Sequence, residues 1–232
     1  MSMTLKQANE IAGNLSYPSK MPGAGWSISA KLCVTGGKLA KVVGSVCHGC
    51  YALKDRYTWT NAQKAMQKRL DGITDPRWVE AMITLLRDKH STPQFRIDLG
   101  KVRNGTRSRL NEAGWHRWFD SGDLQAVWHL DKICAIAHAT PKIRHWLATR
   151  EAKMIASYIA SGGVVPDNLV IRISATMIGD RPPTSWGHTS TVHAGDQDIV
   201  GHECPAPTQG NACGSCRAYW SPDVKNVSYH LH

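Results

Sequence analysis

The sequence predicts an α/β fold, because segments of strand and helix character alternate along its middle and short links join them. Polar residues directly follow several of the predicted strands, where α/β folds carry their ligands. In addition, six of the seven cysteines fall into two groups, one toward each end of the chain. We therefore expect a single α/β domain over residues 1–232. It should be an irregular or partial (βα) barrel with a cysteine-rich N-terminal loop and a long cysteine-containing C-terminal loop.

Periodicity, and the residues that interrupt it, predict the individual elements. Apolar residues at helical spacing mark helices, while Gly, Pro, Asp and Asn mark the links between elements. The first 25 residues are punctuated by such residues and should be irregular. In chain order we expect a short strand over 26–32, helices over 51–70 and 77–89, a strand over 115–120, a helix over 124–139, a strand over 142–148, a helix over 152–161, and strands over 168–176 and 224–232.

The composition is that of an ordinary globular protein, with 42% hydrophobic and 20% charged residues. No apolar window approaches the roughly 20 residues of a membrane span, and no signal segment opens the chain, so we expect a cytoplasmic protein without membrane contact. In that compartment grouped cysteines bind metal or do redox work more often than they form disulfides. Nothing in the sequence indicates an oligomeric state.

The net charge of +10 makes nucleic acid a candidate partner. The strongest local candidate is the basic segment 101–112, which follows a potential strand over 95–102. A solvated loop explains its charges equally well. The cations concerned are Lys101, Arg103, Arg107 and Arg109.

Charged residues also stand at the carboxyl ends of two predicted strands. Asp120 and Asp123 follow the strand over 115–120, and Arg150 and Glu151 follow the next strand. Because parallel strands end at the same edge of a sheet, these groups can form a site wall that orients a ligand and exchanges protons with it. Capping of the following helices is the alternative. It explains Arg150 and Glu151 least well.

The cysteines give the clearest chemical signal. Each group has one distant cysteine and then a Cys-x-x-Cys pair, whose two sulfurs can face one metal ion, cluster or redox disulfide. Cys134 lies outside both groups among apolar neighbours, which predicts a buried, inert thiol. The two groups are Cys33, Cys47 and Cys50 near the N-terminus, and Cys204, Cys213 and Cys216 near the C-terminus.

The stretch from residue 178 to the second group has no periodicity and is rich in Gly, Pro, Ser, Thr and His. A segment this long without periodicity is usually functional or disordered, and the embedded cysteines favour function. His188, His193 and His202 could add metal ligands. An isolated loop histidine is usually solvated, so we assign them no role.

The run SVCHGCYAL, with Cys33 upstream, resembles the Cys-Tyr-Ala signature of phage-encoded proteins of unassigned function. The segments SGDL, TRE and NLVIRISAT resemble the middle of those proteins, and CPA…CGSC resembles their end. Those proteins are in turn similar to radical S-adenosylmethionine enzymes, which have partial or full (βα) barrels and an iron–sulfur cluster on three cysteines. The resemblance implies a [4Fe–4S] cluster at Cys33, Cys47 and Cys50, with S-adenosylmethionine as a further candidate cofactor.

Two features depart from the pattern that this resemblance implies. Thirteen residues separate Cys33 from Cys47, whereas the radical enzymes have three at this place. The tail reads CRAYW where the related proteins are expected to read CRACW, so Tyr219 stands in place of a cysteine. The second group has therefore either lost a ligand or never used one.

Three thiolates leave one iron of a [4Fe–4S] cluster without a cysteine. Such an iron could bind S-adenosylmethionine or accept sulfur, which would make the protein an enzyme acting on a small or nucleic-acid-derived substrate. Alternatively, a tail cysteine completes the cluster and makes it structural or electron-transferring. The main competing hypothesis is a Zn²⁺ ion on both Cys-x-x-Cys pairs in a basic nucleic-acid-binding module without catalysis. A dithiol redox enzyme is the weaker third, since neither pair has a thioredoxin-like context.

Overall fold

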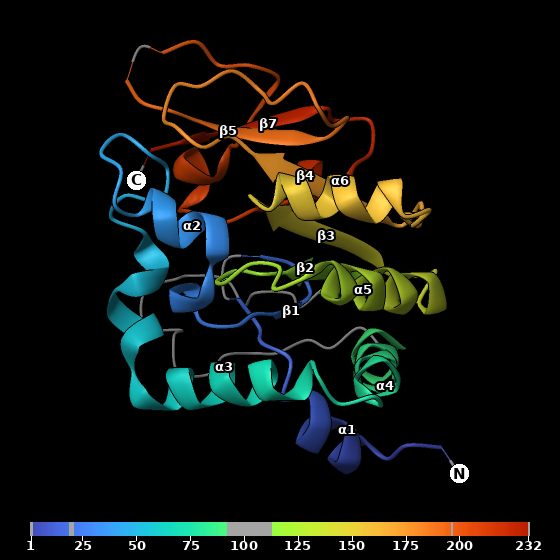
Figure 1. The fold of residues 1–232 in the computed structure, drawn as a ribbon. Helices are drawn as coiled ribbons and strands as arrows, with labels where there is room; N and C mark the ends of the chain where they lie inside the picture. Colours follow the sequence, from blue (N-terminus) through green and yellow to red (C-terminus); the bar gives the residue numbers. More distant parts are fainter. Residues whose placement is uncertain (1, 19–20, 92–112, 196, 232) are drawn as a thin grey trace.

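The computed structural model describes residues 2–18, 21–91, 113–195 and 197–231. Seven strands form one parallel sheet in the order β1-β2-β3-β4-β5-β7-β6 (Figure 1). Among the described residues the outermost strands, β1 and β6, do not pair with each other, so the sheet is open. The predicted α/β class is confirmed. The strands are β1 (Ala24–Trp26), β2 (Trp115–Trp118), β3 (Arg144–Thr149), β4 (Leu169–Ser174), β5 (Thr189–His193), β6 (His202–Glu203) and β7 (Asn226–His230).

From β1 to β5 the strands are added to the sheet in chain order, and all pairs are parallel. Right-handed crossovers without a reversal of direction return on one side of a sheet, so the helices gather on one face. Figure 1 shows α5 and α6 in front of the central strands. The helices are α1 (Leu5–Ala12), α2 (Val34–Leu39), α3 (Thr60–Gly72), α4 (Trp78–Ser91), α5 (Val127–Ala139) and α6 (Ala152–Ala160).

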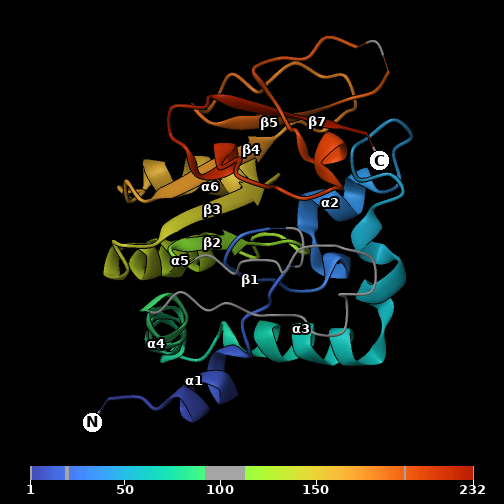
Figure 2. The same ribbon diagram turned by 180° about the vertical axis from the view of Figure 1, so that it is seen from behind.

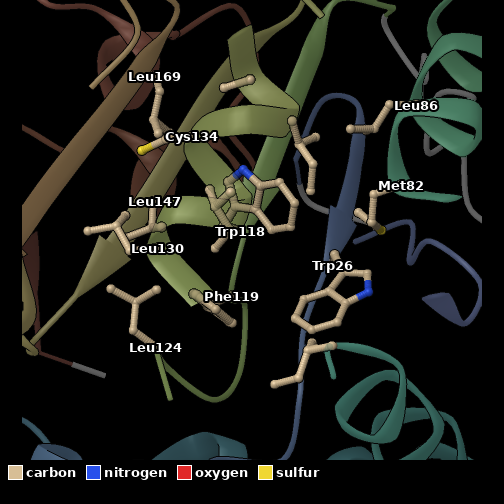
Figure 3. Packing of buried hydrophobic residues seen from close by; sticks show 14 of the residues in the cluster. Trp26, Met82, Leu86, Trp118, Phe119, Leu124, Leu130, Cys134, Leu147 and Leu169 are labelled. Atoms are coloured by element: carbon tan, nitrogen blue, oxygen red, sulfur yellow. The ribbon is translucent and has the colours of Figure 1, made fainter. Parts of the chain in front are cut away.

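Successive residues of a strand point to opposite faces of the sheet. Different parts of the chain pack against these two faces. Leu147 and Leu169 belong to the larger apolar core with residues of α5, and Figure 3 shows Cys134 among them. Cys134 is 4% exposed, as predicted for a buried thiol. Trp146, on the opposite face, packs against the C-terminal segment, residues 204–220. Figure 2 shows that segment, in orange and red, on the face turned away in Figure 1.

Arg172 on β4 ties the C-terminal segment to the sheet. Its side chain is fully buried and, among the described residues, donates hydrogen bonds to backbone carbonyl oxygens alone. Burial lowers the pKa of Arg172 to about 10, so the guanidinium stays charged at neutral pH and is stabilised by carbonyl dipoles. The carbonyl acceptors are those of Ala218 (2.8 Å), Ser221 (3.0 Å), Tyr219 (3.1 Å), Thr189 (3.4 Å) and Lys225 (3.4 Å).

Three predicted boundaries are wrong. The helix expected over 51–70 begins only at Thr60, after two short 3₁₀ turns, and Asp55 at the start of the second turn has a positive φ of 47° that a continuous α-helix does not accept. The strand expected over 26–32 ends at Trp26, since the Ser29 hydroxyl accepts a hydrogen bond from the Lys31 amide and starts a 3₁₀ turn. The helix expected from residue 124 begins at Val127. The other predicted helices and strands are confirmed within a few residues, except the segments over 95–102 and 101–112, which lie outside the described residues.

Four elements were not predicted. Helix α1 lies in the expected irregular segment and starts with a capping box between Thr4 and Gln7. Helix α2 lies inside the cysteine-rich loop, and β5 and β6 lie in the stretch expected to lack structure. Strand β5 escapes detection because its buried side chains are polar and bond to β7 instead of forming an apolar pattern. Those bonds join Thr189 to Asn226 (2.8 Å) and Thr191 to Ser228 (3.2 Å).

Candidate functional site

The cysteine-rich segment lies at the carboxyl edge of the sheet. In Figure 1 the arrowheads of β3 and β4 point toward α2. Cys33 directly precedes α2, and Cys47 and Cys50 lie in the loop that follows it. Backbone hydrogen bonds fix this loop to the residues after β4, from the Val46 amide to the Thr176 carbonyl oxygen (2.9 Å) and from the Ile178 amide to the Gly44 carbonyl oxygen (3.0 Å).

Gly36 of α2 forms the floor beneath two of the thiols. A Cβ atom at this position would lie 3.0 Å from the Cβ of Cys33 and 3.5 Å from the Sγ of Cys47. Both side chains therefore face the same small patch of α2 backbone. A larger residue would crowd the side chains of Cys33 and Cys47, which gives this glycine a packing role.

The pKa shifts of Cys33 and Cys47 show which charged groups lie near the first cysteine group. Burial raises the pKa of Cys33 to about 12, and negative charge on Asp123, Cys47 and Cys50 adds to the rise, while Arg150 opposes it. Burial also raises the pKa of Cys47, again opposed by Arg150. The fold thus brings together these thiols, a carboxyl group and a guanidinium that the sequence placed in three separate segments.

Asp123 joins the ends of two strands. Its carboxylate accepts hydrogen bonds from the Thr149 hydroxyl (2.6 Å) and from the amides of Leu124 (2.8 Å) and Arg150 (2.9 Å). Burial raises the pKa of Asp123 to about 6, even though these bonds favour its charged form. It does not cap a helix, since α5 begins four residues later at Val127 and its N-cap residue is Ala126. Asp123 can therefore both hold the loop after β3 and carry a proton near neutral pH.

Glu151 positions α2 rather than facing the thiols. It is 4% exposed, and its two carboxylate oxygens accept hydrogen bonds from the Thr35 amide and the Thr35 hydroxyl, both at 2.7 Å. The amide belongs to the first turn of α2, where the backbone donors lack helical partners. Glu151 therefore holds the beginning of α2, and with it Cys33, against the loop after β3.

Arg150 is the predicted site residue best placed to contact a ligand. Its charge lowers the pKa of both Cys33 and Cys47, so its guanidinium lies near the thiols. Its Nε atom is buried and makes no hydrogen bond to the described residues. A buried donor without a partner is costly, and a bound anionic group would satisfy it.

Asp120 lies apart from the thiols. Its backbone oxygen accepts a hydrogen bond from the Tyr51 hydroxyl (2.8 Å), and its carboxylate accepts one from the Tyr57 hydroxyl (3.3 Å). Its charge is not among those that shift the pKa of Cys33 or Cys47. Asp120 therefore anchors the chain just after Cys50.

Sequence reasoning missed Arg117 on β2. Its guanidinium stacks over Trp146, 4.7 Å from the ring centroid. Burial alone would lower the pKa of Arg117, but the pKa is raised by Tyr51 and Asp120 among its neighbours, and its own charge lowers the pKa of Cys213. Arg117 therefore lies between the segment after the first cysteine group and the second group. The sequence signal that could have identified Arg117 is a cationic residue inside the predicted strand WHRW.

The second cysteine group is also gathered in space, but in an aromatic environment. The Cys204 Sγ lies 2.6 Å from the Tyr219 hydroxyl, and the Cys216 Sγ lies 3.4 Å from Nε2 of His202. The Tyr219 ring stacks on Trp146 at a centroid distance of 4.4 Å. Burial and Cys204 raise the pKa of Cys213 to about 11. Tyr219, which stands where a cysteine was expected, thus contacts Cys204 of the second group.

The two groups do not share thiol neighbours among the described residues. The cysteine charges that shift the pKa of Cys33 and Cys47 come from the first group, and those that shift Cys213 come from the second. Each of these three cysteines thus has its thiol neighbours within its own group.

In the described part of the chain, no helix has the length and apolar character that crossing a bilayer requires. The search of curated proteins and the search of solved structures both return no match. The family model described as Gene product 88 matches residues 3–222, nearly the whole chain. This match agrees with the resemblance to phage proteins of unassigned function found from the cysteine motifs. The chain belongs to the Gene product 88 family of phage proteins.

Proposed function

We propose that Cys33, Cys47 and Cys50 bind a [4Fe–4S] cluster that leaves one iron without a cysteine ligand, and that the protein is an enzyme using this iron. The observation that carries the proposal is the gathering of three thiols beside Asp123 and Arg150 at the carboxyl edge of a parallel sheet. That edge is where α/β folds bind their ligands. We also infer that the open sheet, with helices on one face, corresponds to a partial (βα) barrel related to those of radical S-adenosylmethionine enzymes.

The spacing of the sulfurs favours a cluster over a zinc ion. A tetrahedral zinc with Zn–S bonds of about 2.3 Å holds its sulfurs roughly 3.8 Å apart. Among the described residues, no three cysteine sulfurs lie within 4.8 Å of one another. A cubane cluster binds each thiolate to a different iron and so needs a wider set. Cys33 and Cys47 both lie over Gly36 of α2, so two of the proposed ligands face the same short stretch of backbone.

The neighbouring residues have separate roles in this proposal. Arg150 would bind an anionic group of the ligand, such as a carboxylate or phosphate, through its unpartnered Nε. Asp123, with its pKa of about 6, would exchange a proton with the ligand near neutral pH. Glu151 would act as a positioning residue for Cys33. A cluster with an open iron supplies a Lewis-acid or one-electron redox centre when bound, and S-adenosylmethionine or a sulfur donor is the ligand class that we expect.

Electron paramagnetic resonance of the reduced protein tests the open iron. We expect the cluster signal to change when S-adenosylmethionine or L-cysteine is added, because a ligand on the open iron alters its surroundings. Arg150→Ala should weaken this response without loss of the cluster, whereas Arg144→Ala, at an exposed site on β3, should leave it intact. A signal that neither ligand alters until Cys204, Cys213 or Cys216 is replaced would instead show a cluster closed by a fourth cysteine. That result would overturn the enzymatic proposal.

A further inference from the structure

Three potential metal ligands lie close together at the carboxyl edge of the sheet, on the strands farthest from β1. His193, Glu203 and His230 are the last residues of β5, β6 and β7, which are neighbouring strands. One nitrogen or oxygen from each lies within 4.8 Å of those of the other two. Two imidazoles and one carboxylate form a donor set typical of catalytic zinc and of non-haem Fe²⁺, with further coordination positions left open.

The register of the strands places the three side chains on one face. His193 on β5 is opposite His230 on β7, and Glu203 on β6 is opposite Ser228 on β7. Residues in register on parallel strands share a face, and so do residues two apart on one strand. Glu203 and His230 therefore project to the same side as His193, and each is held by a hydrogen-bonded strand rather than by a loop.

The hydrogen bonding of the two ring nitrogens of His193 indicates that a ligand binds beside this residue. This side chain is 2% exposed, and its Nδ1 lies 2.7 Å from the Ser228 hydroxyl. Its Nε2 is buried and makes no hydrogen bond to the described residues. The hydrogen bond between Glu203 and His230, at 2.6 Å, accounts for those two groups but gives Nε2 of His193 no partner among the described residues. A cation bound there would satisfy it, and Ser228 would then accept the Nδ1 proton and fix the tautomer.

We propose that His193, Glu203 and His230 bind one divalent first-row transition ion, Zn²⁺ or Fe²⁺. Metal–nitrogen bonds of about 2.05 Å hold ligand atoms roughly 3.3 Å apart. The Glu203 oxygen and the His230 nitrogen, 2.6 Å apart, would therefore separate slightly to admit the ion, and the His193 nitrogen lies within 4.8 Å of both ligand atoms. The movement falls on the partly exposed side chains, since Glu203 is 47% and His230 40% exposed. The same exposure leaves the remaining coordination positions open to water or a small anionic substrate. The site uses no cysteine and is independent of the proposed cluster.

Cobalt binding tests the site in the full-length, cluster-containing protein. Co²⁺ is the probe because X-ray absorption at the cobalt edge separates nitrogen and oxygen ligands from sulfur, even beside an iron–sulfur cluster. We expect about one Co²⁺ per chain with nitrogen and oxygen ligands. Glu203→Gln and His230→Gln should each weaken binding, measured by equilibrium dialysis, roughly 10–100-fold or more. Both replaced side chains are partly exposed, so these variants should remain folded.

Matched controls are His138→Gln on α5 and Asp167→Asn before β4, which replace an exposed imidazole and an exposed carboxylate elsewhere. Both should bind Co²⁺ like the parent. The proposal is overturned if Glu203→Gln and His230→Gln bind as tightly as the parent, if the parent binds none, or if the bound cobalt has only sulfur ligands. The iron and sulfide content of the same samples reports on the cluster separately, so that failure of either proposal leaves the other standing.

Discussion

The two cysteine groups have the same sequence form but different surroundings. The first group lies beside a buried carboxyl group and a guanidinium at the carboxyl edge of the sheet, and two of its thiols pack over Gly36. The second packs into an aromatic cluster, where the Tyr219 hydroxyl contacts Cys204 and the ring of Tyr219 stacks on Trp146. A Cys-x-x-Cys pattern indicates only that two sulfurs can lie close together. The residues around the sulfurs indicate whether they bind a ligand or pack into the core.

Loss of the Arg172 guanidinium should have the largest effect on the second region. Arg172→Ala leaves five carbonyl oxygens, in three buried and two partly buried hydrogen bonds, without this donor and removes the link between β4 and the C-terminal segment. We expect the free energy of unfolding, measured by chemical denaturation, to fall by about 3–5 kcal/mol. The rate of backbone amide hydrogen exchange should increase most in residues 204–231. Arg144→Ala, at an exposed position of β3, is the control and should change stability little; an equal loss there would refute this role for Arg172.

A cysteine at position 219 should make the second region resemble a metal site. The Tyr219 hydroxyl already lies 2.6 Å from the Cys204 sulfur. A cysteine side chain is shorter than that of tyrosine, so the sulfur of Tyr219→Cys would lie closer to the main chain than this hydroxyl does. It would supply the fourth thiol of the expected CRACW pattern beside the three present, the set that zinc prefers in structural sites. We expect about one additional Zn²⁺ per chain by metal analysis. Tyr219→Phe should gain none, and the first region should be unaffected in both variants. No gain of zinc in the cysteine variant would mean that the tail thiols do not converge as described.

Removal of the Glu151 carboxylate should loosen the first region. Glu151→Ala leaves the partly buried amide and hydroxyl of Thr35 without their acceptor, which should cost about 1 kcal/mol, the low end for an unsatisfied group. Because Glu151 positions α2 rather than binding the cluster, we expect iron to be retained but released faster to a chelator. Glu151→Gln should restore part of the retention, whereas Glu10→Ala on the exposed side of α1 should have no effect. Iron loss as complete as in a cysteine variant would make Glu151 a ligand instead.

Asp123→Asn should produce the smallest and most selective change. Burial and the charge of Asp123 hold the pKa of Cys33 near 12, so its reactive thiolate becomes scarcer as pH falls. In the metal-free protein the variant should be alkylated at Cys33 several-fold faster than the parent at pH 8. The pKa of Asp123 itself is about 6, so the carboxyl is neutral below that pH and the two proteins should converge there.

Site-resolved mass spectrometry measures these alkylation rates. Cys213 is the internal control, because its pKa is raised by burial and Cys204 and not by Asp123. A parallel change at Cys213, or a difference between the two proteins that persists well below pH 6, would contradict this account.

Much of the fold could be predicted because the central strands are apolar and the helices between them are periodic. Strands β2 to β4 and helices α4 and α6 follow from these patterns alone. Strand β5 did not, since its buried threonines are satisfied by Asn226 and Ser228, which lie more than thirty positions away. Polar side chains that are paired only in the folded chain give no local signal of a strand.

The site could be predicted in part for a similar reason. Cysteine spacing identified both groups, and the strand ends identified Asp123, Arg150 and Glu151. Their roles depend on contacts that are distant in sequence, such as the one between Glu151 and Thr35, which are 116 positions apart. The set of His193, Glu203 and His230 is distributed over three strands, two of which were not expected. Only the parallel register brings these residues together.

The central claim is that the first cysteine group, and not the second, binds an iron–sulfur cluster. Its most direct test is the iron and acid-labile sulfide content per chain after anaerobic purification of the parent, Cys47→Ser, Cys213→Ser and Cys134→Ser. We predict about four iron and four sulfide per chain in the parent and in the Cys213 and Cys134 variants, and nearly none in Cys47→Ser. A colourless parent with about one zinc and no sulfide, or equal loss in Cys213→Ser, would contradict the claim. The zinc result would favour a zinc-stabilised nucleic-acid-binding module instead.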